Sequence, residues 1–418
     1  MTTLHRILIV ILFTIAFASH GCSGSEDGNG PEAGAWTVLV YMAADNNLPY
    51  DLGPAALRDM NEMEEVGSTD LVNVIVQVDL HEGTEWETCR RYRIESDSDP
   101  LMVTSPVLDD LGEQDMTDPD TLEDFLRWGK STYPAARYLV VLWGHGDAWQ
   151  DEQQVQVMAI FDDDDPVREK LTPNFLVRQA MEGAGMRADI LAFDACDMGI
   201  LEAAYEFGGR ADFMVASQEL VWQDGYPYDD ILAAVVSDPE IAPEELARTM
   251  VQLYGSYYTS MYPFSRYEQC LSALDLSRAN AVANQVEVLA QDLRAEIDDV
   301  DFLDALQDVR EVSEDFVTPL EPRHRFVDLL HLAEGLEAEP GLGLNTDPLE
   351  SAISVMVVEN FQRSGSGGHP NASGLSIYFP LDKDDYEDDP SYSGAVSPSA
   401  FLDFHWDEFL EEYFENMP

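Results

Sequence analysis

The stretch YLVVLWGHGD, residues 138–147, contains an unbroken apolar run that ends at a glycine and a histidine. A second run, DILAF at 189–193, ends in a similar way at the residues Asp-Ala-Cys-Asp. Apolar runs of this length that are rich in β-branched and aromatic residues are typical of strands buried on both faces of a parallel sheet. The two runs therefore predict neighbouring parallel strands, with His145 just after the first and Cys196 just after the second.

Similar apolar runs lie on either side of this pair. They are WTVLVYM at 36–42, LVNVIVQV at 71–78 and FMVAS at 213–217. Segments with the apolar spacing of a helix lie between the runs, at residues 57–66, 122–132, 174–182 and 198–207. Strands that alternate with helices favour an α/β fold with a mostly parallel sheet and helices on both of its faces. We expect this domain to extend over residues 36–245.

The pattern becomes mostly helical after Ile241 and predicts a largely helical C-terminal portion over residues 246–418. Helices are expected at 243–258, 279–297 and 301–314, a returning strand near 375–379, and a closing amphipathic helix at 401–414. The sequence does not indicate what residues 245–373 do.

Reactive side chains follow two of the predicted strands. Functional groups collect at the carboxyl ends of the strands in an open parallel sheet, so we expect His145 and Cys196 to face one crevice. An imidazolium lowers the pKa of a nearby thiol and can later protonate a leaving amine, as acyl transfer by cysteine requires. A helix beginning near Met198 would favour the thiolate through its dipole. Gly146 allows a sharp turn, so that the N–H groups of Gly146 and Cys196 could hold a developing oxyanion.

Each of these two residues alone also has an ordinary structural interpretation. A single Cys is most often a small buried apolar residue, and a lone His can be a hydrogen-bonded strand-end residue or a zinc ligand. No third His or Cys lies at ligand spacing near either one, which disfavours a metal-dependent hydrolase. A non-catalytic surface lipoprotein that binds a partner on the same scaffold is a further alternative, but it gives no reason to retain both His145 and Cys196.

Several longer stretches carry a resemblance to a known family. They are WTVLVYMAADNNL at 36–48, VVLWGHGDAW at 140–149, DILAFDACDMGILEAAYEF at 189–207, the elements ASQE and DGYPY within 216–228, and GLSIYFP at 374–380. On these motifs the chain resembles the clostripain family of cysteine peptidases, within the caspase-like clan, from Trp36 to about Phe414. Caspases place their His about 50 residues before the Cys, and here the separation is 51 residues, from 145 to 196.

The resemblance implies a caspase-like cysteine endopeptidase with a dyad of His145 and Cys196 and no third member. The family typically cleaves after Arg or Lys, which requires an acidic residue at the base of the primary specificity pocket. Asp194 and Asp224 stand where such residues are expected, and Asp194 is the stronger candidate. Asp194 could instead cap a helix or hold a backbone N–H. The clan also contains peptidases selective for Asp or Asn, although two acidic residues favour a basic substrate side chain.

The interval between the His and the Cys carries two further features that the resemblance makes relevant. Family members are often made as inactive chains that cut themselves in this interval, and Arg168 and Lys170 form a candidate self-cleavage site. Several members are helped by calcium, and hard cations prefer carboxylate oxygens. A candidate calcium site therefore consists of four consecutive residues, Asp162, Asp163, Asp164 and Asp165. They lack the spacing of a dedicated calcium loop and are by default a surface loop, and we expect no cofactor to be required.

The charge of the chain restricts its partners. Acidic residues number 81 against 22 basic residues, which gives a net charge of −59. Such a chain repels phosphates, so nucleic acid and anionic lipid are excluded as partners, whereas peptides or proteins with basic residues are attracted. A highly acidic surface that serves solubility alone is an equal alternative.

The first residues predict export. His5 and Arg6 precede an apolar run from Ile7 to Ala18 that is too short to span a bilayer and is typical of a signal peptide, here residues 1–21. Gly21-Cys22 resembles the cleavage site of bacterial lipoproteins, although Ser19 replaces the usual Leu, so we expect lipidation of Cys22. Residues 22–35 are rich in Gly, Ser and acid and predict a flexible tether. The expected location is the bacterial cell envelope, or otherwise the periplasm or the extracellular space.

Overall fold

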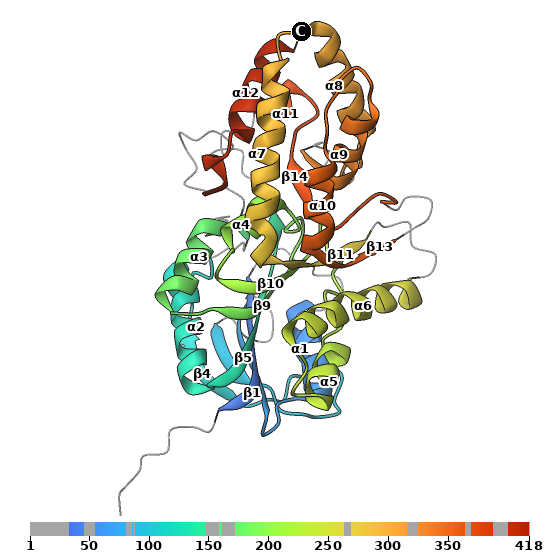
Figure 1. Ribbon diagram of the computed structural model, residues 1–418. Coiled ribbons are helices and arrows are strands. Elements are labelled where there is room, and N and C mark those ends of the chain that lie inside the picture. Colours follow the sequence, from blue (N-terminus) through green and yellow to red (C-terminus); the bar gives the residue numbers. More distant parts are fainter. Residues whose placement is uncertain are drawn as a thin grey trace, which may run out of the picture. The chain divides into compact units, whose positions relative to one another are not determined.

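The computed structural model describes residues 33–45, 55–80, 86, 88–147, 159–160, 172–262, 269–316, 325–363, 369–387 and 400–417 (Figure 1). Ala33–Pro418 make up one compact unit. Among the helices that lie within these ranges, none is long and apolar enough to cross a membrane.

A nine-stranded sheet forms the centre of the fold, in the order β13-β11-β10-β9-β5-β1-β2-β3-β4. Its middle is parallel and consists of β1 (Gly34–Ala44), β2 (Val72–Leu80), β5 (Ala135–Trp143), β9 (Ala188–Asp194) and β10 (Ala211–Ala216). All five strands predicted for residues 36–217 are therefore present and adjacent. The prediction of a mostly parallel sheet is confirmed.

Antiparallel strands extend the sheet on both sides. On one side lie β3 (Cys89–Arg93) and β4 (Val107–Gly112), and on the other β11 (Cys270–Asp275) and β13 (Val357–Gln362). The sequence pattern indicated none of these four strands. Since β11 and β13 come from the C-terminal portion, the sheet continues beyond residue 245.

Two hydrophobic cores lie on the two faces of the sheet, and β1 contributes to both. Leu39, Tyr41 and Ala43 belong to one core, whereas Val38, Val40 and Met42 belong to the other. Successive side chains of a strand point to opposite faces, so a strand covered on both faces must be apolar throughout. This explains why the predicted strands read as unbroken apolar runs.

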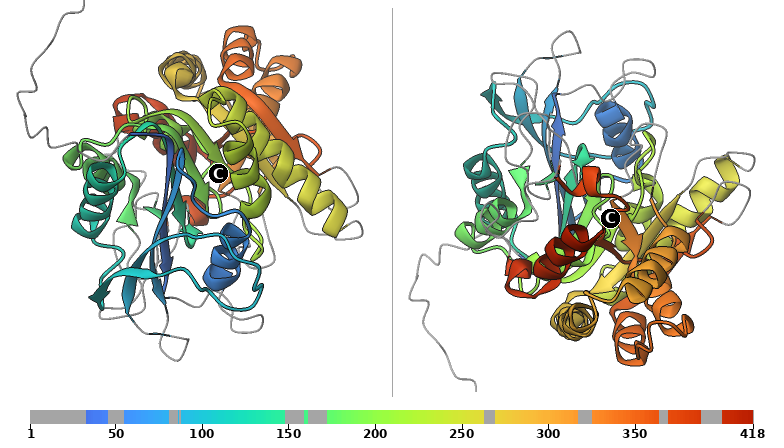
Figure 2. Two further views of the ribbon diagram at one scale, coloured as in Figure 1. Left: turned by 90° about the horizontal axis from the view of Figure 1, so that it is seen from below. Right: turned by 90° about the horizontal axis from the view of Figure 1, so that it is seen from above.

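Helices cover both faces, as Figure 2 shows. The first core packs under α2 (Pro119–Thr132), α3 (Asn174–Gly183), α4 (Leu201–Glu206) and α7 (Ala279–Ala295). The second core packs under α1 (Ala55–Val66), α5 (Tyr228–Ser237) and α6 (Pro243–Met261). The predicted placement of helices on both faces is correct.

The C-terminal portion is largely helical, as predicted. Besides α6 and α7 it contains η1 (Leu276–Arg278), α8 (Val300–Val312), α9 (Leu329–Ala338), α10 (Asp347–Met356), α11 (Lys383–Glu387), η3 (Ala400–Asp403) and α12 (Trp406–Asn416). The predicted closing helix is divided between η3 and α12. The returning strand is β14 (Ser376–Tyr378), which pairs with β12 (Phe326–Asp328) in a separate small sheet. A third small sheet contains β6 (Gly146–Asp147), β7 (Ala159–Ile160) and β8 (Thr172–Pro173).

Candidate active site

The two predicted reactive residues lie at one edge of the sheet. Strands β5 and β9 pair in parallel, and Trp143 at the end of β5 is in register with Asp194 at the end of β9. His145 and Cys196, each two residues further along, both line a small pocket of about 60 Å³. The other lining residues are Ala55, Trp143, Gly144, Asp194, Ala195, Val221, Trp222, Gln223 and Gly225. The sequence-based pairing of imidazole and thiol is therefore found in the fold.

Gly146 packs directly against the backbone of Cys196. A Cβ atom placed on Gly146 would lie 2.1 Å from the carbonyl oxygen of Cys196 and 2.5 Å from its nitrogen. No side chain fits in this space, since real Cβ contacts stay beyond about 3 Å. The glycine is thus required for the close approach of two backbones, and its φ is not in the left-handed region.

The turn that carries Cys196 has a strained backbone and a nearby hydrogen-bond donor. Asp197 adopts a φ of 57°, a left-handed conformation that residues with a side chain seldom accept. The backbone N–H of Val221 donates to the sulfur of Cys196 over 3.4 Å. A hydrogen bond of this kind favours a thiolate, and the sulfur also lies 3.9 Å from the carbonyl oxygen of Val221, to which a neutral thiol donates.

The helix expected near Met198 begins later than predicted. α4 starts at Leu201 and contains six residues, so Cys196 does not lie at its N-terminus. Met198 continued the apolar spacing of the helix, but the backbone there still follows the strained turn, and the N–H of Gly199 donates to the carbonyl of Ser217. The amide of Val221 takes the role that we had assigned to the helix dipole.

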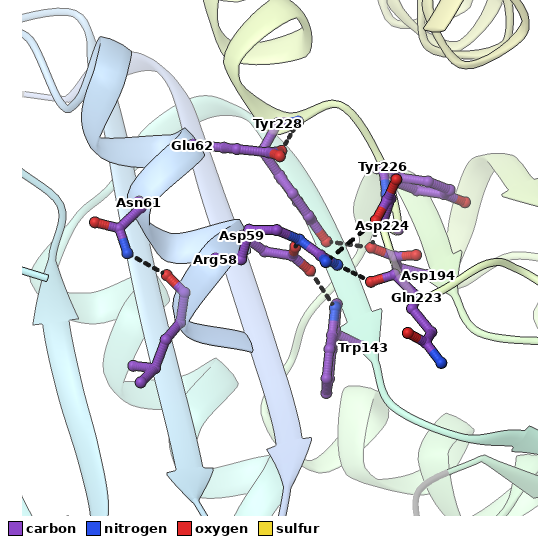
Figure 3. Close-up of polar contacts among 12 residues, drawn as sticks. Arg58, Asp59, Asn61, Glu62, Trp143, Asp194, Gln223, Asp224, Tyr226 and Tyr228 are labelled. Carbon is purple, nitrogen blue, oxygen red and sulfur yellow. Dashed lines mark hydrogen bonds and ion pairs between the residues drawn. The ribbon is translucent and has the colours of Figure 1, made fainter. Parts of the chain in front are cut away.

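Asp194 is buried at the end of β9 and lines the pocket. Figure 3 shows its contacts with Tyr226 and Tyr228. Its Oδ2 accepts hydrogen bonds from the backbone N–H of Tyr226 at 3.1 Å and the hydroxyl of Tyr228 at 2.8 Å. Burial raises the pKa of Asp194 to about 6, although these two donors act in the opposite direction. The carboxylate thus changes charge close to neutral pH.

Asp224 is engaged by other side chains and is not among the residues that line this pocket. Its Oδ1 lies 3.1 Å from a guanidinium nitrogen of Arg58, and its Oδ2 accepts hydrogen bonds from the hydroxyls of Tyr257 and Tyr262. Arg58, on α1, also donates to the carbonyl of Gln223 (Figure 3). The sequence pattern did not single out Arg58.

A third acidic residue, Asp59, lies beside the pocket and was also missed. It is fully buried on α1, and its Oδ2 accepts a hydrogen bond from the indole N–H of Trp143 at 2.7 Å (Figure 3). Burial raises the pKa of Asp59 well above its usual range, and the neighbouring carboxylates of Asp194 and Glu62 add to the effect. Burial likewise raises the pKa of Glu62, to about 8. A layer of acidic groups therefore lies behind the pocket wall.

Other predicted site residues lie outside the described residues. These are Cys22, Asp162, Asp163, Asp164, Asp165, Arg168 and Lys170. Within the described ranges, no group of three or more His, Cys, Asp or Glu side chains could hold a metal ion. Cys89 and Cys270 are buried there and form no disulfide.

A thiol and an imidazole that line one pocket at the ends of adjacent parallel strands define a caspase-like cysteine peptidase. The sequence pattern of the clostripain family matches residues 40–412, and the chain belongs to this family. Clostripain from Hathewaya histolytica is 25% identical in an alignment of length 398, and the alignment covers 82% of this chain and 74% of the relative.

Solved structures share the fold. A secreted C11 cysteine protease from Bacteroides thetaiotaomicron, bound to an irreversible peptide inhibitor, superimposes with a TM-score of 0.64 and 22% identity, covering 90% of this chain and 100% of that one. An inactive zymogen of a C11 protease from Parabacteroides distasonis gives a TM-score of 0.61 and 19% identity. The match covers 91% of this chain and 99% of that one. The predicted family, fold and enzyme class are thereby confirmed, and the protein is a cysteine endopeptidase.

Proposed function

We propose that this endopeptidase cleaves peptide bonds after Arg or Lys, with Cys196 as nucleophile and His145 as its acid and base. The observation that carries the proposal is the shared pocket, which brings together the thiol, the imidazole and the buried carboxylate of Asp194. A substrate carbonyl beside the thiol would place its side chain near that carboxylate. The net charge of −59 attracts basic substrates over a longer range.

The chemistry follows from the groups in the pocket. The Cys196 thiolate attacks the scissile carbonyl, and the N–H groups of Gly146 and Cys196 hold the oxyanion that forms. The His145 imidazolium gives its proton to the departing amine, which leaves a thioester on Cys196. Neutral His145 then removes a proton from a water molecule that attacks the thioester, and the acid product and the thiolate are restored.

The preference for a basic residue depends on Asp194. The hydrogen bonds from Tyr226 and Tyr228 to this carboxylate both go to Oδ2, so a guanidinium or ammonium group would meet Oδ1. Asp224 contributes indirectly: its ion pair with Arg58 ties α1 to the segment that follows Trp222. The Asp194 carboxylate supplies the negative charge at the base of the pocket, whereas burial favours the neutral form of Asp59.

The remaining parts of the proposal concern the cell and activation. We propose export by the N-terminal signal and anchoring through a lipid on Cys22, and secretion is stated for one similar protease. Self-cleavage at Arg168 or Lys170 would precede activity, and calcium at Asp162–Asp165 would assist it. Labelling of cells with a radioactive fatty acid tests the anchor, since Cys22→Ala would lose both label and membrane attachment. The mass of the chain after incubation, with calcium or a chelator, tests self-cleavage.

A cleavage map tests the activity and its specificity. The soluble mature protein, its Cys196→Ala and Asp194→Asn variants, and Cys89→Ala as a matched control are incubated with a mixed peptide library. Cut sites are then read by mass spectrometry. Cuts after Arg or Lys should vanish in Cys196→Ala, weaken in Asp194→Asn and persist in Cys89→Ala. Cuts after Asp or Asn would instead refute the basic specificity, and hydrolysis by Cys196→Ala would refute the nucleophile.

A further inference from the structure

The turn that carries Cys196 is hydrogen-bonded to one segment, Ser217–Val221, which follows β10. The N–H of Gly199 donates to the carbonyl of Ser217 at 2.6 Å, and the N–H of Asp197 donates to the carbonyl of Glu219 at 3.3 Å. The N–H of Val221 donates to the Cys196 sulfur at 3.4 Å. The position of the sulfur and its amide donor therefore depends on where Ser217–Val221 lies.

A buried histidine of the C-terminal portion, His369, contacts this segment through the side chain of Glu219. Nε2 of His369 lies 3.0 Å from the carboxylate of Glu219, and its Nδ1 lies 2.8 Å from the carboxylate of Glu314. His369 and Glu219 are buried, and the ring of Phe316 packs on the imidazole with ring centroids 4.8 Å apart. The histidine thus bridges two carboxylates in a site that is shielded from water.

The geometry of the bridge determines its protonation state. A carboxylate accepts hydrogen bonds, and a neutral imidazole carries one N–H, so it could serve only one of the two carboxylates. Both ring nitrogens face a carboxylate oxygen, and the doubly protonated imidazolium is the form that donates to two carboxylates at once. Although burial raises the pKa of Glu314, the hydrogen bonds from His369 and from the N–H of Asn371 outweigh it and lower that pKa below its usual value. The bridge is therefore a charged one.

The adjacent residue, Gln218, is fixed by the same portion of the chain. Its side-chain amide donates to Asp328 at 3.0 Å and to the hydroxyl of Ser376 at 2.8 Å. Its carbonyl oxygen accepts the N–H of Gly374 at 2.7 Å. The Gln218 amide carries no charge, but its partner Asp328 is a carboxyl group whose pKa burial raises, so Asp328 is a second titratable group behind the segment.

We infer that His369 is a positioning residue for the nucleophile: as an imidazolium between Glu219 and Glu314, it fixes the segment that donates an N–H to Cys196. The inference rests on the proposed role of Cys196. It also assigns a function to part of the C-terminal portion, whose His369 contacts Glu219 in the segment beside Cys196. Loss of the His369 proton at high pH would leave two facing carboxylates without their shared cation, and the segment would move.

Other titratable groups lie around the bridge. His331 accepts the N–H of Glu314 through Nδ1 at 2.8 Å. Burial, with a contribution from Glu219, raises the pKa of the Cys270 thiol to about 12. Within the described cluster, His369 is the group that faces both carboxylates of the bridge.

The test compares His369→Gln and Glu314→Gln with the wild-type protein. Two quantities are measured between pH 6 and 10: kcat and KM on a peptide substrate, and the rate of Cys196 alkylation by iodoacetamide without substrate. We expect His369→Gln to lower kcat roughly ten- to hundredfold, the effect of losing a hydrogen bond between charged groups, with little change in KM. Glu314→Gln removes one of the two anions, so its activity should fall at a lower pH than that of the wild type.

The control is His405→Gln, because His405 pairs with Glu287 at an exposed site away from the pocket. It should keep the wild-type pH profile. A purely structural role would lower the melting temperature of the His369 and Glu314 variants and leave their pH profiles unchanged, which would overturn the inference. Absence of alkylation at Cys196 in the wild type would refute the nucleophile itself, so the two failures are distinguishable. If His369→Gln does not fold, the pH dependence of Glu314→Gln activity alone tests the inference: a shift to lower pH supports it, and an unchanged profile overturns it.

Discussion

Substitution of Gly146 by alanine should inactivate the enzyme while leaving most of its fold intact. The added Cβ would lie 2.1 Å from the Cys196 carbonyl oxygen, 2.5 Å from the Cys196 nitrogen and 2.9 Å from the Ala195 carbonyl carbon. Ordinary contacts begin near 3.4 Å, so the two backbones must separate by roughly 1 Å. All three neighbours are backbone atoms, and no side chain can rotate away to relieve the contact.

The expected magnitude follows from this displacement. A 1 Å misplacement of reacting groups costs about 100-fold in rate, and overpacking costs about 1–3 kcal/mol of stability. The assay measures kcat/KM on a basic peptide, the alkylation rate of Cys196, and thermal unfolding. Gly341→Ala is the matched control because a Cβ there meets its nearest atoms at 3.3 Å and 3.4 Å, away from the pocket. A Gly146→Ala enzyme with wild-type activity would show that this contact does not position Cys196.

Three further predictions concern the acidic groups beside the pocket. Because burial raises the pKa of Asp194 to about 6, KM for an Arg substrate should rise as the pH falls below 6, and Asp194→Asn should show a high KM at every pH. The raised pKa of Asp59 means that the fold prefers its neutral form, so its contribution to stability falls as the pH rises above the unfolded value near 4. The free energy of unfolding of Asp59→Asn, measured in urea, should therefore rise relative to that of the wild type between pH 5 and 8. A difference between the two proteins that stays constant over this pH range would contradict the prediction. Arg58→Ala should lower the melting temperature and raise KM, because Asp224 loses its cation; an unaltered KM would show that the ion pair does not shape the pocket.

The sequence predicted a strand well where burial on both faces requires apolar side chains along its whole length. β1 is buried on both faces, so its apolar run is unbroken and the strand is predictable. β13 is half-buried throughout and contains Glu359, Asn360 and Gln362, so it lacks both an apolar run and a clear alternation. Its position beside β11 depends on tertiary pairing, which local patterns do not contain.

The same distinction applies to the site. His145 and Cys196 could be paired because both follow apolar strands and parallel strands end at a common edge. Arg58 could not be linked to Gln223, since 165 positions separate them in the chain and a lone Arg on a helix is commonly a surface residue. Asp59 precedes Met60 on the buried side of α1. An acidic residue at a helix position that faces the core was the one sequence signal that could have revealed the role of Asp59.

The antiparallel pairing of β10 with β11 has a practical consequence for any shortened form of the protein. Removal of the chain after residue 245 would strip β11 and β13 from the sheet and leave β10 as an outer strand. Its row of exposed N–H and C=O groups, beside the apolar Met214 and Val215, would then be a template for pairing with other molecules. Such a fragment should aggregate, so the peptidase has to be produced with β11 and β13 in place.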